Sequence, residues 1–258
     1  MANPRFLVPE LAPAPGAAPA ASGVAVLPEA ASHHARRVLR LRPGDAVTLF
    51  DGAGHEFHAV LMPADAKDET HSRARIVAAA AVDREATIAV TLVQALSAQE
   101  KIDWLVEKCV ELGVRRLVLA PSERSVVRLE AARQARRLAR WHEIAVSAAC
   151  QCGRNRLMSI DYAPDLGGAL RLALDGCERR WVLDPGAPAG IGAGLAARDL
   201  AAGVLCVVGP EGGFTEEEIA LAESLGYARA RLGARVLRTE TAGVAVVCAV
   251  LALGGEYS

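Results

Sequence analysis

Apolar and polar positions alternate in two different ways along this chain of 258 residues. In the first part, short apolar stretches at 46–50, 56–61 and 74–82 are separated by turn residues, and residues 51–54 have the composition of a hairpin turn. A short helix is predicted at 32–39, and the Pro- and Ala-rich segment 11–22 is predicted to be a mobile loop. This pattern indicates a small, mostly β domain at 1–83, followed by a second domain at 84–258.

The second part alternates strand and helix patterns. Apolar runs at 87–96, 117–120, 181–183, 205–208 and 228–232 predict strands, and helices are predicted at 97–113, 130–150 and 242–253. We interpret Ser97-x-x-Glu100 as a capping box that starts the first of these helices, which Gly113 ends. Such alternation is typical of an α/β domain whose parallel sheet is covered on both faces.

Two polar loops leave neighbouring strand ends of this sheet. The run at 205–208 stops at Gly209-Pro210-Glu211-Gly212-Gly213, and the next helix starts with a second capping box, Thr215 with Glu218. The strand at 228–232 leads into the loop 233–241. Open α/β sheets bind ligands at such strand ends, so the pair of loops predicts a ligand site.

The residue types in the loops limit the classes of ligand that this site can bind. The first loop has no lysine, contains Glu211, and precedes a helix that opens with three glutamates, so it suits a neutral or cationic ligand better than a triphosphate. A tight strand-to-helix turn without a ligand is the alternative for that loop alone. The motif Gly190-x-Gly192 has Leu195 in place of the third glycine, which disfavours a dinucleotide site.

Composition limits the class of protein. A hydrophobic content of 52% and a charged content of 23% are typical of a globular chain. The N-terminus has no apolar segment of signal-peptide length, and the longest apolar stretch, 242–253, is shorter than the ~20 residues that span a bilayer. From the lengths of these segments we expect no membrane association. None of the six cysteines forms a C-x-x-C pair, so we also expect no metal site and a reduced, cytoplasmic setting.

Charge is unevenly distributed although the net charge is only −1. Eight arginines and two acids lie between Arg115 and Arg140, and a stripe at 133, 136, 137 and 140 follows one face of the predicted long helix. A second basic cluster comprises His33, His34, Arg36, Arg37, Arg40 and Arg42. A solvated helix face is the plainer interpretation of the stripe, and packing is the plainer one for at least one histidine; binding of an RNA backbone is the functional alternative.

The two loops resemble the cofactor-binding region of the RsmE family. The motif 209–213 is followed by Leu232-Gly233-x-Arg235-x-Leu237-Arg238-x-Glu240-Thr241, and further family landmarks occur upstream in family order: Pro4-Arg5-Phe6, His33-His34 to Arg42, Glu107-Lys108 to Gly113, Ser122-Glu123-Arg124 and Gln151-Cys152-Gly153-Arg154. The resemblance covers nearly the whole chain. It implies a SPOUT-type α/β domain with a C-terminal trefoil knot, preceded by a PUA-like β-barrel.

The same resemblance implies a function. RsmE enzymes use S-adenosylmethionine to methylate N3 of a uridine in the 16S ribosomal RNA of the small subunit, and the fold class implies a homodimer. Methylation of another RNA such as transfer RNA, or RNA binding without catalysis, are the alternatives.

Site residues follow from the matching motifs. For the cofactor, the resemblance implies Leu183, Gly209, Glu211, Gly213, Leu232, Gly233, Leu237, Arg238 and Thr239. For catalysis it implies Arg5, Arg154, Arg238 and Glu240, and for RNA binding we predict Arg5, His33, His34, Arg36, Arg40, Arg124, Arg133 and Arg137. Cys150 stands where many relatives have a glutamate, and a thiol is a poor though possible proton acceptor.

Overall fold

The computed structural model describes residues 3–14, 16–64, 70–174 and 176–257. Contacts divide the chain into two compact units. The N-terminal unit comprises residues 1–85 together with 146–157, and the C-terminal unit comprises residues 86–145 and 158–258.

A mixed five-stranded sheet forms the N-terminal unit. Its strands, in the order β1-β3-β4-β5-β2, are Arg5–Leu7, Ala46–Phe50, His55–Leu61, Arg73–Ala81 and Gly23–Val26. The pairing of β1 with β3 is parallel and the other pairings are antiparallel. Helix α1 (Glu29–His33) continues into a π-helical turn, η2 (His34–Val38), and a short 3₁₀ turn, η1 (Pro9–Leu11), follows β1.

Alternation of side chains along these strands builds one core. Leu49 and Phe57 are fully buried, with Phe6 and Leu27 beside them in the same cluster. The predicted strands β3, β4 and β5 and the short helix are confirmed, and in the predicted hairpin turn Asp51 Oδ1 accepts the amides of residues 53 to 55. The two outer strands β1 and β2 were not predicted, because three or four residues are too few to establish a period of two.

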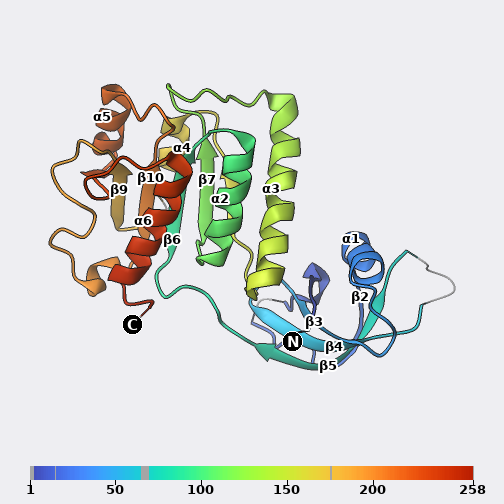
Figure 1. The fold of residues 1–258 in the computed structure, drawn as a ribbon. Coiled ribbons are helices and arrows are strands. Elements are labelled where there is room, and N and C mark those ends of the chain that lie inside the picture. Colours follow the sequence, from blue (N-terminus) through green and yellow to red (C-terminus); the bar gives the residue numbers. More distant parts are fainter. Residues whose placement is uncertain (1–2, 15, 65–69, 175, 258) are drawn as a thin grey trace. The chain divides into compact units, whose positions relative to one another are not determined.

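Six parallel strands form the sheet of the C-terminal unit (Figure 1). In the order β11-β9-β10-β6-β7-β8 they are Ala228–Ala230, Arg179–Leu183, Val204–Val208, Val90–Ala95, Arg116–Ala120 and Ser159–Tyr162. All five strand pairings are parallel, which confirms the prediction. The central strands β6 and β10 are buried along their whole length, as expected for a sheet covered on both faces.

Helices cover both faces of this sheet. On one face, α2 (Gln99–Glu111) packs against α6 (Thr239–Leu253), and Figure 1 shows the two side by side in front of the sheet. On the other face, α4 (Leu166–Leu172) and α5 (Glu216–Ser224) pack together over a core that includes Val93, Leu205 and Val207. The remaining helices are the long α3 (Ala131–Cys152), whose last turns belong to the N-terminal unit, and the 3₁₀ turn η3 (Ala197–Leu200).

The two predicted capping boxes have different outcomes. Thr215 is the N-cap of α5, and it exchanges hydrogen bonds with the amide and carboxylate of Glu218 as predicted. The capping box at Ser97 is wrong, because α2 begins at Gln99 with Ala98 as its N-cap, and the buried Ser97 hydroxyl has no hydrogen-bond partner among the described residues. Within the described ranges, no helix is both long enough and apolar enough to cross a membrane.

Candidate functional site

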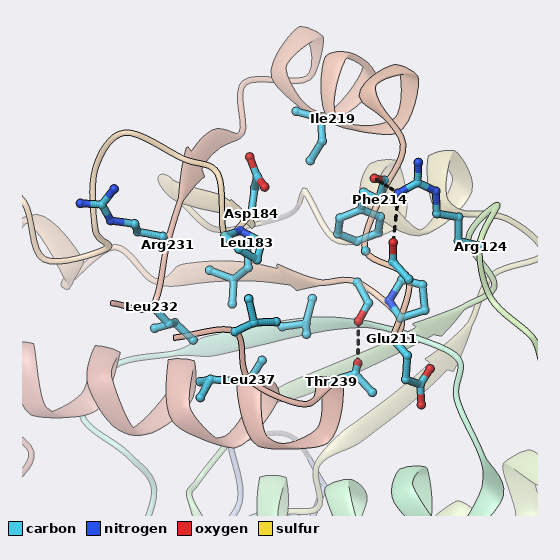
Figure 2. Close-up of a pocket in the computed structure, with 18 of the residues that line it drawn as sticks. Arg124, Leu183, Asp184, Glu211, Phe214, Ile219, Arg231, Leu232, Leu237 and Thr239 are labelled. Atoms are coloured by element: carbon cyan, nitrogen blue, oxygen red, sulfur yellow. Dashed lines mark hydrogen bonds between the residues drawn. The ribbon is translucent and has the colours of Figure 1, made fainter. Parts of the chain in front are cut away.

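A cavity of about 410 Å³ lies at the carboxyl edge of the parallel sheet, where β9, β10 and β11 end (Figure 2). Its walls come from the segments that follow these strands and from the start of α6. The apolar lining includes Leu183, Phe214, Ile219, Leu232 and Leu237. The two loops predicted from the sequence therefore meet around one cavity. The prediction that they leave neighbouring strands is wrong, because β9 lies between β10 and β11 in the sheet.

Local sequence explains the shape of the first loop. The apolar strand β10 ends at Val208, and the amide of Gly213 donates to the carbonyl of Pro210 over 2.9 Å to close a tight turn. Gly213 adopts a φ of +68°, a conformation that costs other residues free energy. The Thr215 cap then starts α5, so the turn is fixed at both ends and its backbone groups remain at the cavity wall.

The second loop is tied directly to the first. Thr239, the first residue of α6, is 4% exposed, and its hydroxyl donates to the carbonyl oxygen of Gly209 over 2.5 Å (Figure 2). On the outside, Lys101 of α2 lies 2.7 Å from Glu211 of the first loop and 3.5 Å from Glu240 of α6. Burial raises the pKa of Glu211, but the hydrogen bond from Lys101 outweighs it and the pKa is lowered, so the carboxylate is ionised at neutral pH.

Charges of both signs surround the cavity. Two of the three arginines in the lining donate to backbone carbonyls: Arg124 Nη1 to Gly212 and Phe214 over 3.0 and 3.2 Å, and Arg231 Nη1 to Ala187 over 3.0 Å. Asp184, directly after β9, pairs with Arg229 over 2.5 Å. Although burial opposes it, the hydrogen bond from Arg229 lowers the pKa of Asp184. Apolar walls with both signs of charge suit a zwitterionic ligand with a flat apolar part. None of the described residues that line the cavity is a lysine, which disfavours a polyphosphate.

Eight of the nine predicted cofactor positions line this cavity. They are Leu183, Gly209, Glu211, Gly213, Leu232, Gly233, Leu237 and Thr239. The ninth, Arg238, is the N-cap of α6, and it lies instead in a neighbouring hollow of about 440 Å³ with Glu240 and the half-exposed Trp104. Glu240 Oε2 is buried and lies 3.5 Å from Lys101 Nζ, which lines the same hollow.

Sequence reasoning missed several lining residues. Asp184 follows β9 directly, so its position at a strand end was a readable signal. Phe214 and Ile219 reach the cavity from the turn and from the first helical turn after it. Arg124 was predicted to bind RNA, and in the structure its guanidinium donates to the carbonyls of Gly212 and Phe214 in the first loop.

Arg5 and Arg154 lie within the N-terminal unit and are paired with its acids. Arg154 is 3% exposed, and its Nη2 lies 2.5 Å from Glu85 Oε2. Arg5 donates to Glu56 over 3.0 Å and to Asn155 over 2.5 Å, and its guanidinium lies 5.2 Å from the centre of the Phe50 ring. Arg5 and Arg154, two of the three predicted catalytic arginines, are thus held by internal partners in this structure.

Glu56 is the centre of that arginine network. Arg84 Nη1 lies 2.9 Å from Glu56 Oε2, the same oxygen that accepts from Arg5. Burial alone would raise the pKa of Glu56, but hydrogen bonds from Arg84, Arg5 and Asn155 lower it to about 2. The network joins β1, β4, the segment after β5 and the segment after α3 into one cluster.

Cys150 is an unsuitable base in this environment. Burial raises the pKa of its thiol to about 11, and the nearby positive charge of Arg5 offsets this only in part. At neutral pH the thiolate is therefore a very small fraction of the population.

Six of the eight predicted RNA-binding residues, all except Arg5 and Arg124, fall on two surfaces, one in each unit. On α3, Arg133 is exposed and Arg137 is half-buried. In the N-terminal unit, His33, His34, Arg36 and Arg40 are exposed around α1 and η2. The His34 ring packs edge-on against Phe6 with 6.3 Å between ring centres, which supports the packing interpretation for one of the two histidines.

Comparisons with known proteins agree with this geometry. Residues 84–251 match the RNA methyltransferase domain family, and residues 27–68 match the RNA methyltransferase PUA domain family. The chain is 32% identical to the ribosomal RNA small subunit methyltransferase E of Mycobacterium bovis over 93% of this chain and 90% of that protein. It is 28% identical to the enzyme of the same name from Bacillus subtilis, over 84% of this chain and 86% of that one.

A solved structure shows the same fold. The ribosomal RNA small subunit methyltransferase E of Neisseria gonorrhoeae, which was solved bound to S-adenosyl methionine, superposes with a TM-score of 0.85. The match covers 100% of both chains at 32% sequence identity. The fold is thus of the SPOUT class, with a PUA-like unit before the parallel-sheet domain.

Proposed function

This chain belongs to the ribosomal RNA small subunit methyltransferase E family, and from that premise we propose that it methylates N3 of a uridine in 16S ribosomal RNA with S-adenosylmethionine as methyl donor. The observation that carries the proposal is the cavity of about 410 Å³ at the carboxyl edge of the sheet, which eight of the nine expected cofactor positions line. A ribosomal RNA substrate places this activity in the cytoplasm.

The residues present fit this cofactor. Its adenine ring suits the apolar wall of Leu183, Leu232 and Leu237, and the backbone of the two loops offers donors and acceptors for its polar edges. Asp184 and Arg231 provide charges of opposite sign for its amino and carboxylate groups. When bound, the cofactor supplies a methyl group carried by a sulfonium. The rest of the cofactor is a good leaving group, because its sulfur departs as a neutral thioether.

The protein must also remove the N3 proton of the uridine or stabilise the resulting anion, because the protonated imide nitrogen is a poor nucleophile. We assign proton acceptance to Glu240, which lines the neighbouring hollow and whose buried Oε2 lies 3.5 Å from Lys101 Nζ. Arg238 lines the same hollow and can stabilise negative charge on the uracil oxygens. The raised pKa of Cys150 argues against the thiol in this role.

Arg5 and Arg154 remain proposed contacts of the target uridine and its phosphates. Direct contact requires that RNA displace Glu56 and Glu85 from the two guanidiniums. The exposed arginines of α3 and the basic residues around α1 and η2 are proposed to bind the phosphate backbone.

Chain topology and assembly complete the proposal. Helix α6 returns from the second loop to pack against β6, β10 and α2, which supports a trefoil knot at the C-terminal end. A homodimer is expected to use the exposed side of α6. Gly243, although it is a small residue of the same helix, cannot form part of the dimer contact, because it is buried against Gln94 and Leu105 of its own chain.

Methyl transfer is tested with labelled S-adenosylmethionine and small ribosomal subunits that lack the modification, followed by mass spectrometry of the nucleosides. We expect 3-methyluridine from the wild type. Methylation of transfer RNA alone would show that transfer RNA, and not ribosomal RNA, is the substrate. Cofactor binding without methylation of either RNA would favour a non-catalytic RNA-binding protein.

Three variants connect the activity to the site. Leu237→Arg should fill the cavity and abolish cofactor binding, whereas Leu253→Arg, at a 38% exposed position at the end of α6, should not. Glu240→Gln should lower turnover about 10²-fold at unchanged cofactor affinity, in line with the loss of a general base. Equal losses of turnover and affinity would refute the assignment of Glu240.

A further inference from the structure

One polar side chain is completely buried behind the two loops of the cavity. Gln94 lies on the central strand β6, is 0% exposed, and does not line the cavity. Its Nε2 donates to Thr239 Oγ1 over 2.7 Å, and Thr239 Oγ1 donates in turn to the carbonyl of Gly209 over 2.5 Å. The chain of hydrogen bonds thus runs from the sheet to the second loop and from there to the first.

The chemistry of the three groups fixes the direction of this chain. A carbonyl oxygen only accepts, so the single hydroxyl proton of Thr239 is committed to Gly209. The hydroxyl can then only accept from Gln94, which requires the amide nitrogen at that position. A carboxylate or an apolar side chain at residue 94 would leave the Thr239 hydroxyl without its donor.

Neighbouring elements approach the Gln94 side chain closely. A Cβ atom at Gly243 of α6 would lie 2.9 Å from Gln94 Oε1 and 2.9 Å from Leu105 Cδ1, so α6 approaches the amide as closely as a glycine allows. In the sheet, Gln94 is paired with Val208, the residue directly before Gly209. The side chain is therefore held between β6, β10, α2 and α6.

We infer that Gln94 is a positioning residue that sets the separation of the two cofactor loops through Thr239, and thereby the affinity for the methyl donor. The inference rests on the proposed cofactor. Gln94 does not touch the cavity, so its effect must pass through the backbone at Gly209 and the start of α6. Loss of the amide donor leaves a buried hydroxyl under-satisfied, and the loops relax to a spacing that fits the cofactor less well.

The test compares Gln94→Met with Thr91→Val in the complete protein. Methionine approximates the shape of glutamine without its donor, and Thr91 is a buried polar residue of the same strand whose hydroxyl faces Cys177 instead of the loops. By calorimetric titration with S-adenosylmethionine we expect Gln94→Met to raise Kd at least tenfold, with kcat at saturating cofactor within about threefold. Thr91→Val should leave Kd within twofold. Equal Kd values for Gln94→Met and the wild type would overturn the inference.

A second readout is independent of the cofactor. Hydrogen exchange of the cofactor-free protein should show faster exchange in Gln94→Met at residues 209–214 and 239–242, and unchanged exchange there in Thr91→Val. Unchanged protection at both loops in Gln94→Met would overturn the inference even if the wild type bound no S-adenosylmethionine. A wild type that binds no cofactor but shows the exchange difference would refute the proposed function and leave the coupling of the loops intact.

If Gln94→Met does not fold, Gln94→Leu replaces it. Leucine also lacks the donor for Thr239 Oγ1, so this variant should raise Kd at least tenfold, and Thr91→Val remains the control. A Kd of Gln94→Leu equal to that of the wild type would overturn the inference.

Discussion

The arginine network around Glu56 should make the stability of the N-terminal unit depend on acidic pH. Glu56 is 6% exposed, and its pKa falls from 4.5 to about 2 because the hydrogen bonds from Arg84, Arg5 and Asn155 outweigh the opposing effect of burial. A shift of that size means that ionised Glu56 contributes about 3 kcal/mol to the free energy of unfolding at neutral pH. Because the pKa is lowered in the folded state, this contribution is present above pH ~4.5 and is lost as the pH falls towards 2.

Glu56→Gln removes the charge and keeps the shape of the side chain. We expect it to lower the free energy of unfolding by about 3 kcal/mol at pH 7, because two buried or half-buried guanidiniums lose their shared partner. Urea unfolding at pH 7 and at pH 3, followed by tryptophan fluorescence and circular dichroism, measures the difference. Glu10→Gln, at an exposed glutamate of the same unit, is the control and should stay within about 0.5 kcal/mol. A difference between wild type and Glu56→Gln that is equally large at both pH values would refute the reasoning.

Three further variants test individual residues. Cys150→Ala should retain methyl transfer within about threefold across pH 6–9, because a thiol with a pKa of about 11 contributes little base; a tenfold loss would restore the cysteine as proton acceptor. Thr215→Ala should lower the free energy of unfolding by about 1 kcal/mol through loss of the α5 cap, and Thr215→Ser should restore it in urea titrations. Arg154→Ala should reduce turnover far more than cofactor affinity; a loss of stability with unchanged turnover per folded molecule would instead show that pairing with Glu85 is its main role.

Local signals made the cofactor loops predictable. Thr215 and Glu218 are three residues apart, so both halves of the capping box are visible in the sequence. The glycines of the first loop directly follow an apolar strand, and the position of a ligand site at the end of such a strand follows from the topology of parallel sheets. The failure at Ser97 shows the limit of the same signal, since packing moved the start of α2 by one residue and buried the hydroxyl.

Long-range pairing could not be predicted from the pattern. An arginine in a family motif can meet either RNA or a glutamate, and Arg154 meets Glu85, 69 positions earlier in the chain. Gln94 is the one polar residue among the apolar positions at the end of β6, and its partner Thr239 is 145 positions away. Strand β8 and helix α4 were also missed, because a four-residue strand and a seven-residue helix are too short for their periods to be recognised.

The cavity consists mainly of loop backbone, so its shape depends on the residues that fix the loops from behind. An exposed ion pair and a pair of buried hydrogen bonds both hold the loops in place. Lys101 and Glu211 are 27% and 43% exposed, so solvent weakens their attraction to about 0–1 kcal/mol. The bonds from Gln94 to Thr239 and from Thr239 to Gly209 are buried, where an unmade hydrogen bond costs about 1–3 kcal/mol. The buried hydrogen bonds should therefore define the spacing of the loops. Salt weakens the exposed Lys101–Glu211 ion pair, so it should change cofactor affinity only weakly.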